Sequence, residues 1–403
     1  MTTNSTPLVT VGYMINETTQ VSKTSHYLFI IHYLSIYALV LIIIGTVGNL
    51  LTIIVLLRRH LRRFVTVRWL IAVSICDIIS LYGWNLNNFY KFNVSSRNSN
   101  IEDISLFHCR FISYMTFVAL QLSSWCLTAV SLDRALNLYW PQWKRLYGRI
   151  RYTKYYIMVL TTICLALNSH ILFLNGYRTS TGIITCYSTR SNPDYIYPQW
   201  ERVHLVLYNL CPFAIMLICN TYIIFVTVRS SRTQQTELTP AKLQRKSLER
   251  YRQFTALLII VTFAFVLLTL PACIYFVFFR NYFVTKAHRT YRFMVQIFLN
   301  SIQFTSHGIN FFLYCFSAKS FRHELHGMFR ELLTSCQCKC RLSLKDNRQH
   351  DHIRQYINNN NNNIEPIIQH QQLLYNRDMQ MNRYKFNFFP EFKSTSDKNP
   401  NWV

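Results

Sequence analysis

Seven long blocks of apolar residues, separated by short polar or basic segments, make up most of the chain. Each block has at least 22 residues, and a helix of that length extends about 33 Å, enough to cross a hydrocarbon core of about 30 Å. We predict membrane-spanning helices at residues 28–57, 69–90, 111–132, 155–177, 203–228, 254–279 and 293–316. The pattern therefore predicts an all-α membrane protein, folded as a seven-transmembrane helix bundle.

Basic residues gather in the segments that follow the first, third and fifth blocks. Residues 58–63, 144–154 and 229–252 are rich in lysine and arginine. Because cytoplasmic loops carry an excess of these residues, we expect a multi-pass protein of the plasma membrane with its N-terminus extracellular and its C-terminus cytoplasmic. Three N-glycosylation sequons then fall on the extracellular side, at Asn4, Asn16 and Asn93.

The blocks divide the chain into four predicted parts. These are a glycosylated extracellular tail (1–26), the seven-helix bundle (27–318), an amphipathic surface helix (319–332) and a cytoplasmic tail (333–403). The short helix is expected from apolar residues at helical spacing, namely Phe321, Leu325, Met328 and Phe329. The tail is polar and carries too few apolar residues for a packed core, so we expect it to be disordered.

The composition supports a membrane protein and argues against nucleic acid as a partner. Charged residues make up 15% of the chain and hydrophobic residues 51%, whereas about 25% of residues are charged in soluble domains. A net charge of +25 is compatible with nucleic-acid binding, but the basic residues lie between apolar spans rather than along one accessible face. Their placement follows the topology of the membrane spans instead.

The twelve cysteines fall into three groups. Most lie within apolar blocks, where they pack as small apolar side chains. Cys109 and Cys186 lie outside the spans on the same predicted side of the membrane. Cys336, Cys338 and Cys340 follow the surface helix, where S-palmitoylation would attach the chain to membrane lipid, and free thiols or weak metal binding are the alternatives.

Asp77 is the one carboxylate in the interior of a predicted span. An ionisable group at that depth is costly, so it is expected to face the bundle and to have partners there, or to bind a cation. Polar residues of other spans that could reach it are Asn49, Ser123, Ser306 and Asn310. The alternative is a neutral, hydrogen-bonded aspartic acid that only packs.

An ordered set of short motifs accompanies these spans. It comprises Gly48-Asn49, Asp77, Cys109, Asp133-Arg134, Pro212, Phe265 with Pro271, and Asn310 with Tyr314. At these spacings on seven spans, the chain resembles a rhodopsin-like (class A) G protein-coupled receptor from residue 28 to residue 330. Residues 211–220 and Asn310-Phe311 are similar to those of the invertebrate neuropeptide receptor branch.

The resemblance implies roles for residues at the two ends of the third span. Cys109 and Cys186 would form the disulfide that ties the second extracellular loop to this helix. Asp133-Arg134 matches the Asp-Arg-Tyr motif, in which the arginine holds the inactive state and then meets the G protein. Leu138, in the second cytoplasmic loop, would pack on the G protein, and Asn310 and Tyr314 match the Asn-Pro-x-x-Tyr motif of the seventh span.

The same resemblance implies an allosteric sodium pocket and no other cofactor. Its residues would be Asn49, Asp77, Ser123, Ser306 and Asn310. Four positions depart from the family pattern, because Ala135, Asn220, Thr269 and Phe311 replace residues that usually take part in switching. These departures concern the switch and the strength of sodium binding rather than the fold.

The ligand implied is extracellular and a peptide. Thr116 stands where amine receptors carry an aspartate, and Phe304 where opsins carry a lysine, which disfavours both ligand classes. The pocket is expected to include Thr116, Gln121, His204, Tyr208, Tyr275, Gln296 and Gln303. For each of these residues, ordinary packing with a hydrogen bond is the alternative.

The expected function is therefore a receptor that activates a heterotrimeric G protein, with arrestin as a further partner, and not an enzyme. A chemosensory or other receptor of the same fold is one alternative. A transporter or channel is the alternative of a different class, but it would need several intramembrane charges or an internal repeat. A membrane enzyme is disfavoured because the histidines are scattered along the chain.

Overall fold

The computed structural model describes residues 8–96, 99–140, 142–234, 242–279 and 289–334, together with residues 351 and 355. The chain forms two compact units, Met1–Met328 and Phe329–Val403. In the second unit the described segment 329–334 is helical. All that follows on the bundle concerns the first unit.

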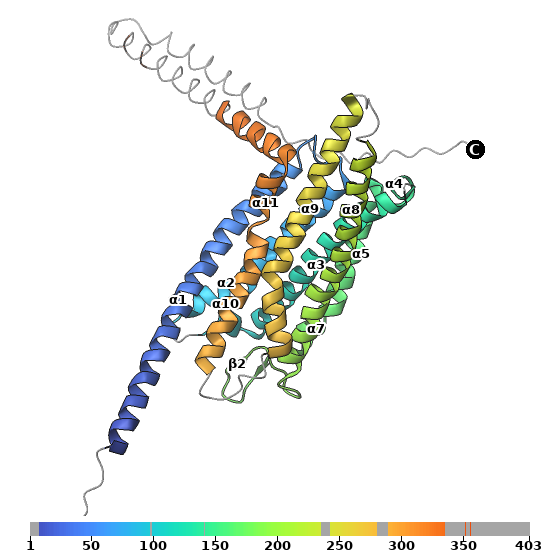
Figure 1. Cartoon of the computed structure of the whole chain (residues 1–403). Helices are drawn as coiled ribbons and strands as arrows, with labels where there is room; N and C mark the ends of the chain where they lie inside the picture. Colours follow the sequence, from blue (N-terminus) through green and yellow to red (C-terminus); the bar gives the residue numbers. More distant parts are fainter. Residues whose placement is uncertain are drawn as a thin grey trace, which may run out of the picture. The chain divides into compact units, whose positions relative to one another are not determined.

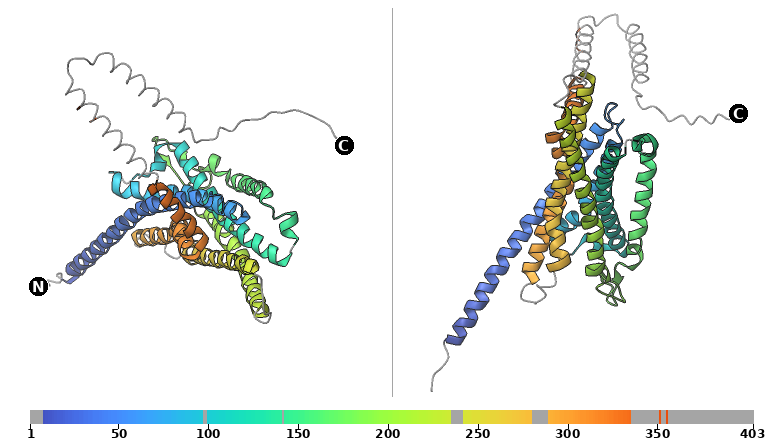
Figure 2. Two further views of the ribbon diagram at one scale, coloured as in Figure 1. Left: turned by 90° about the horizontal axis from the view of Figure 1, so that it is seen from above. Right: turned by 45° about the vertical axis from the view of Figure 1, so that its right-hand side comes forward.

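The first half of the bundle consists of four long helices. These are α1 (Leu8–Leu56), α2 (Val65–Phe89), α3 (Leu106–Tyr139) and α5 (Ile150–Asn168), and the short helices α4 (Trp143–Leu146) and α6 (Ile171–Leu174) precede and follow α5 in the chain. Figures 1 and 2 show α2, α3 and α5 running side by side. Since α3 contacts α2, α5 and α8, it forms the axis of the bundle.

The ends of α3 follow from local chemistry. Ser105 caps its first turn by accepting a hydrogen bond from the His108 amide at 3.2 Å. At the other end Trp140 leaves the helix with an extended backbone, φ −126° and ψ 95°, because the residue before a proline, here Pro141, is driven out of the helical region.

The second half of the bundle contains helices interrupted by π-helical turns. It comprises α7 (Glu201–Leu205), the turn η4 (Val206–Leu210), α8 (Cys211–Gln234), α9 (Lys242–Ile274), the turn η5 (Tyr275–Phe279), α10 (Arg289–Gly308) and α11 (Asn310–Ser317). Pro212 lies just after the turn η4 and Pro271 lies inside α9, so each removes an amide hydrogen from a continuing helix. The turn η5 begins four residues after Pro271, so the span does not end as a regular α-helix.

A small hairpin covers one end of the bundle. Strands β1 (Tyr177–Arg178) and β2 (Ile184–Thr185) pair antiparallel. The π-helical turn η3 (Tyr195–Trp200) follows before α7, and a 3-10 turn η2 (Ile101–Ile104) precedes α3. We call this end, where Cys109 lies, the disulfide end, and the opposite end, where Arg134 lies, the arginine end.

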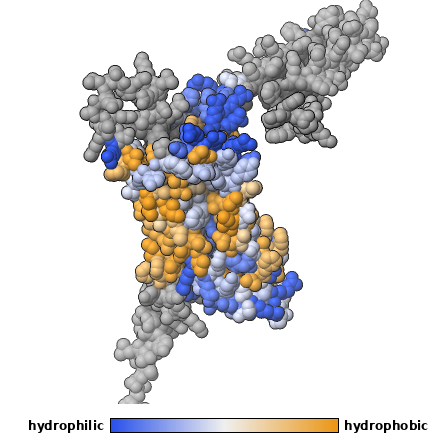
Figure 3. Space-filling view, turned by 90° about the vertical axis from the view of Figure 1, so that its right-hand side faces the viewer, coloured by the Kyte–Doolittle hydropathy of each residue, from blue (hydrophilic) through white to orange (hydrophobic). Residues whose placement is uncertain are grey.

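The membrane-spanning character of the bundle is plain from its surface. Figure 3 shows a band of hydrophobic residues across the middle of one face and hydrophilic residues at both ends. Of the residues that the structure describes, six helices are long and apolar enough to cross a membrane: His26–Leu56, Val65–Val94, Leu106–Tyr139, Ile150–Leu174, Tyr195–Arg229 and Ile259–Phe279. The expected multi-pass helical fold is confirmed.

The seventh predicted span differs from the other six. It is divided at Ile309 into α10 and α11, and it is more polar because α10 carries Gln296, Asn300, Gln303 and His307. The helices begin before the predicted starts throughout, as three of them illustrate. The first helix already begins at Leu8, the third at Leu106 and the fourth at Ile150, because polar residues at a membrane border continue a helix as readily as apolar ones.

Close backbone contact fixes α1 against α10. A Cβ atom on Gly45 would lie 3.2 Å from the Gly308 Cα and 2.4 Å from the Leu81 Cδ1. Small residues at a helix crossing allow such approach within membranes. The polar α10 is thus brought into the interior of the bundle.

The short helix predicted after the seventh span is present at residues 319–334. Phe321 and Met328 are buried, as the amphipathic pattern predicts, whereas Phe329 is exposed. Glu324 is also buried and pairs with Arg58, at 2.8 Å between Oε2 and Nε. The helix is therefore tied to the chain just after α1 by an ion pair as well as by apolar contacts.

Candidate functional site

A disulfide joins α3 to the segment after the hairpin. Cys109 and Cys186 are bonded, as the family resemblance implies. Asn175, fully buried, fixes the same joint: its Nδ2 donates to the Cys109 carbonyl at 3.2 Å and to Ser113 Oγ at 3.0 Å. Its Oδ1 accepts from the Tyr187 amide at 2.9 Å. We call the segment of Cys186 and Tyr187, with the hairpin before it, the lid.

A buried carboxylate holds the lid from the other side. Glu102, 1% exposed in η2, accepts a hydrogen bond from Tyr187 Oη at 2.7 Å and another from Asn87 Nδ2 at 3.3 Å. Burial raises the pKa of the Glu102 carboxyl to about 7. No sequence motif singles out Glu102, because the loop that carries it looks like an ordinary polar connection.

Beneath the lid lies an open cavity of about 100 Å³. About half of its lining residues are aromatic, with amide, hydroxyl and imidazole groups among the rings and one carboxylate. The lining residues are Trp84, Ser113, Thr116, Phe117, Leu120, Tyr187, Tyr197, Glu201, His204, Leu205, Tyr208, Phe276, Asn300, Gln303 and Phe304. A concave, largely apolar site with a few convergent polar groups is the usual form of a ligand pocket.

Four of the seven predicted pocket residues line this cavity, namely Thr116, His204, Tyr208 and Gln303. The imidazole of His204 donates from Nε2 to the Phe117 carbonyl at 2.9 Å and meets the Phe117 ring edge-on. This nitrogen is thus engaged in holding α7 against α3.

The other three predicted pocket residues are not among the lining residues. Gln121 Oε1 accepts from Asn168 Nδ2 at 2.7 Å, which joins α3 to α5. Gln296 Nε2 donates to the hydroxyl of the lining residue Tyr197 at 2.6 Å. Tyr275 lies in η5 and packs against the core of the bundle. The lining residues instead include Tyr187, Tyr197 and Glu201, because the loop before α7 folds back over the cavity.

Asp77 lies beneath the cavity, fully buried, and both of its carboxylate oxygens are occupied. Oδ1 accepts from Ser123 Oγ at 2.6 Å and from His307 Nδ1 at 2.7 Å. Oδ2 accepts from Asn310 Nδ2 at 2.6 Å. Two of the four predicted partners thus bond to Asp77 directly, and the third direct partner is a histidine.

Ser306 and Asn49 bond elsewhere, which corrects the predicted set around Asp77. Ser306 Oγ donates to the Gln303 carbonyl at 2.7 Å, and Asn49 Nδ2 donates to the His307 carbonyl at 2.9 Å. The sequence did contain a signal for His307, because an ionisable residue inside a predicted span is expected to have a partner there.

At the arginine end, the Asp133-Arg134 pair bonds outwards to neighbouring helices. Arg134 Nη2 donates to Thr66 Oγ1 of α2 at 2.6 Å. Asp133 Oδ1 accepts from the indole of Trp143, in α4, at 3.1 Å. Leu138 lies in the last turn of α3, not in the following loop, since the helix continues to Tyr139. It packs beside a buried cluster of Ala135, Cys219 and Ile223.

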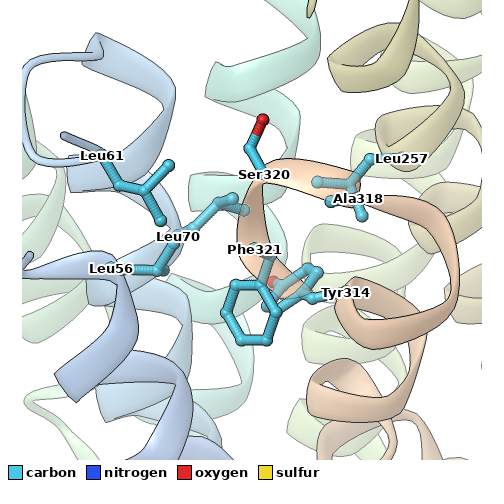
Figure 4. A pocket seen from close by; sticks show the side chains of 8 residues that line it. All are labelled: Leu56, Leu61, Leu70, Leu257, Tyr314, Ala318, Ser320 and Phe321. Carbon is cyan, nitrogen blue, oxygen red and sulfur yellow. The ribbon is translucent and has the colours of Figure 1, made fainter. Parts of the chain in front are cut away.

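Tyr314 lies at the same end, 1% exposed, with its ring against that of Phe321. Within the part of the chain that the structure describes, its hydroxyl has no hydrogen-bond partner. A small apolar cavity of about 20 Å³ surrounds it, shown in Figure 4. The lining residues are Leu56, Leu61, Leu70, Leu257, Tyr314, Ala318, Ser320 and Phe321.

The predicted modification sites are only partly within the described structure. Asn93 is half-buried, and its Nδ2 donates to Ser35 Oγ at 2.7 Å and to the Phe89 carbonyl at 3.2 Å, so a glycan, which replaces one of the two hydrogens on Nδ2, would remove one of these bonds. Asn4 and the cysteines Cys336, Cys338 and Cys340 lie outside the described residues, as does the side chain of Asn16.

Comparison with known protein families gives a match over most of the bundle. The model of the 7 transmembrane receptor (rhodopsin family) matches residues 48–314. This range contains Asn49 in α1, the disulfide-bonded cysteines, the Asp133-Arg134 pair and Tyr314.

Similar proteins include receptors named for galanin. Galanin receptor type 2 of Rattus norvegicus is 24% identical over 294 residues, which cover 72% of this chain and 74% of the relative. Galanin receptor 2a of Danio rerio is 24% identical over 301 residues, 71% of this chain and 75% of the relative. G-protein coupled receptor 182 of Mus musculus is 28% identical over 226 residues, 53% of this chain and 51% of the relative.

Proposed function

Because the chain belongs to the rhodopsin family of seven-transmembrane receptors, we propose that it binds an extracellular peptide and activates a heterotrimeric G protein. The proposal places the disulfide end outside the cell and the arginine end in the cytoplasm of the plasma membrane, as the basic segments favour. On this proposal the protein is a transducer without enzymatic activity.

The cavity beneath the lid is the observation that carries the proposal. It is open, and it lies between α2, α3, α7, η4, η5 and α10. Aromatic walls with scattered amide and hydroxyl groups suit the side chains and backbone of a peptide, because rings contribute large contact area and the polar groups fix its orientation. The resemblance to receptors named for galanin supports a peptide over an amine or retinal.

The arginine end supports the second half of the proposal. Arg134 is half-buried, and its Nη2 donates to the Thr66 hydroxyl of α2, which connects the end of α3 to a neighbouring helix. Tyr314 is buried beside a small apolar cavity, and its hydroxyl has no hydrogen-bond partner among the described residues, which leaves a polar group unsatisfied in this arrangement. Both features fit a bundle with two arrangements of this end, one of which exposes a binding face for a G protein and later for arrestin.

The test is a screen of neuropeptides against membranes from cells that express the receptor, with guanine-nucleotide exchange on added G proteins as the readout. A peptide that stimulates exchange is then applied to the Arg134→Ala variant, for which we expect at least a tenfold loss of stimulated exchange with unchanged surface expression. Arg151→Ala is the matched control, because Arg151 is exposed at the same end of α5. Full exchange in Arg134→Ala would refute the assigned role of this residue.

A further inference from the structure

We infer that His307 takes the place that an allosteric sodium ion holds in the resembled family, and that it links the ligand cavity to Asp77 through Tyr208. The signalling consequence rests on the proposed receptor function, whereas the ion-binding part stands on the geometry of the buried core. Three contacts carry the inference, and each involves fully buried side chains.

The first contact is the set of hydrogen bonds to the carboxylate of Asp77. Its oxygens accept three hydrogen bonds, from Ser123, His307 and Asn310, at 2.6, 2.7 and 2.6 Å. A sodium ion needs oxygen atoms that offer lone pairs, and here N–H and O–H groups point at these lone pairs instead. Three of the roughly four lone-pair sites of the carboxylate are thus occupied, and an ion at Oδ1 would have to displace His307 or Ser123.

The second contact involves the imidazole of His307, which uses both of its ring nitrogens. Because an ionised carboxylate can only accept, Nδ1 must carry a proton and donate to Asp77. The opposite nitrogen, Nε2, lies 3.1 Å from Tyr208 Oη. In the neutral ring Nε2 accepts the tyrosine proton, so one imidazole satisfies both neighbours. The His307 carbonyl is held by Asn49, which fixes the backbone at this turn.

The third contact reaches the cavity. Tyr208 lines the cavity and is itself fully buried. Its ring stacks on His204 at 5.7 Å between centroids, and His204 is a lining residue as well. A ligand that shifts Tyr208 therefore acts on His307 and, through it, on Asp77 and Asn310, which begins α11. The connection is a chain of side chains and involves no ion.

The two remaining residues of the expected sodium pocket, Ser306 and Asn49, bond to the main chain and not to Asp77. Ser306 Oγ and Asn49 Nδ2 donate to main-chain carbonyls, and among the described residues Asn49 Oδ1 is a buried oxygen without a hydrogen-bond partner. The three groups bonded to Asp77 thus present donors where a cation would have to bind. On these residues, sodium does not fit the core of this bundle.

The test of the ion part uses sodium alone as the probe and needs no ligand. Purified full-length receptor in detergent micelles is unfolded by heat in sodium chloride and in choline chloride of equal ionic strength. We expect equal midpoints for the wild type, and a higher midpoint in sodium for His307→Ala, which frees the carboxylate and leaves room for an ion. That gain is expected to vanish in His307→Ala/Asp77→Asn.

A sodium-specific rise in the wild-type midpoint would overturn the inference, and this result does not depend on whether any variant folds. Equal midpoints for His307→Ala in the two salts would overturn it as well. Loss of nucleotide exchange in the screen would bear on the proposed function alone and would leave these midpoints unchanged.

The test of the link uses pairs of substitutions. The midpoint shift of Tyr208→Phe/Asp77→Asn should differ from the sum of the single shifts, because both act on His307. In a His307→Ala background the two shifts should add. Tyr208→Phe/Ser74→Ala is the control pair and should add in both backgrounds, since Ser74 bonds within α2 to the Leu70 carbonyl. Additive shifts for Tyr208 and Asp77 with His307 present would overturn the link.

Discussion

The two ends of the bundle are held together in different ways. At the disulfide end a covalent bond is surrounded by paired polar side chains, among them the buried Glu102 and Asn175 and the half-buried Tyr187. At the arginine end the polar contacts of Arg134 and Arg58 involve half-buried side chains, and the buried Tyr314 hydroxyl has no partner among the described residues. Breaking a buried paired network costs more than breaking half-exposed contacts. The comparison indicates a fixed ligand-binding end and an end built to rearrange.

The largest expected effect is the loss of the disulfide. Cys109→Ser should lower the free energy of unfolding by about 2–5 kcal/mol, because the unfolded chain regains the freedom that the bond removes. It should also reduce surface expression and peptide binding together, since the lid is no longer tied to α3. Chemical unfolding of the purified receptor measures the first effect and flow cytometry the second.

Cys211→Ser is the control for this change, because Cys211 is a half-buried free thiol. It should leave stability and expression close to those of the wild type. Equal losses for Cys109→Ser and Cys211→Ser would contradict the view that the disulfide end is the fixed end.

The next effect is a dependence of stability on pH that comes from Glu102. Its pKa is about 7 in the folded chain against 4.5 as the ordinary value. The unfolded state therefore ionises first as the pH rises, and the stability that this group contributes is complete below about 4.5 and lost by about 7. At about 1.4 kcal/mol for each pKa unit, the loss amounts to about 3 kcal/mol.

A comparison of the wild type with Glu102→Gln isolates the contribution of Glu102 to the pH dependence of stability. Over that pH range the wild type should lose more free energy of unfolding than the variant, which cannot ionise at this position. Parallel pH profiles for the two proteins would show that burial does not raise the pKa of the Glu102 carboxyl in the folded chain.

The smallest effect is expected from the ion pair of Arg58 and Glu324 at the arginine end. Its side chains are 27% and 10% exposed, so a double-mutant cycle with alanine should give a coupling of about 0.2–1 kcal/mol. Added salt should weaken it further, because the Arg58 side of the pair is open to screening. A coupling as large as the effect of the disulfide would remove the contrast between the two ends.

The fold was predictable from the sequence because long apolar blocks and basic loops constrain a membrane protein strongly. The seventh helix fits less well, since the pairing of Gln296, Gln303 and His307 across the bundle allows a polar segment inside the membrane. The disulfide followed from the family resemblance. Helix limits such as the start at Leu106 and the end at Tyr139 did not, because the polar residues there do not mark where a helix stops.

The sequence predicted those residues of the candidate site whose role depends only on their place on a helix. Thr116, Tyr208 and Gln303 face the cavity because they lie on the inner side of their helices. Glu102, Tyr187 and His307 acquire their roles from residues far away in the sequence. A carboxylate in a loop and a histidine in a span carry no local sign of the partner that each will meet.

The most direct test of the contrast between the two ends is hydrogen–deuterium exchange of the receptor with and without its peptide and a nucleotide-free G protein. We predict that amide protection changes at Asp133–Tyr139 and around Tyr314, while the segment from Asn175 to Tyr187 keeps its protection or gains more. Loss of protection in the lid, with no change at the arginine end, would contradict the account.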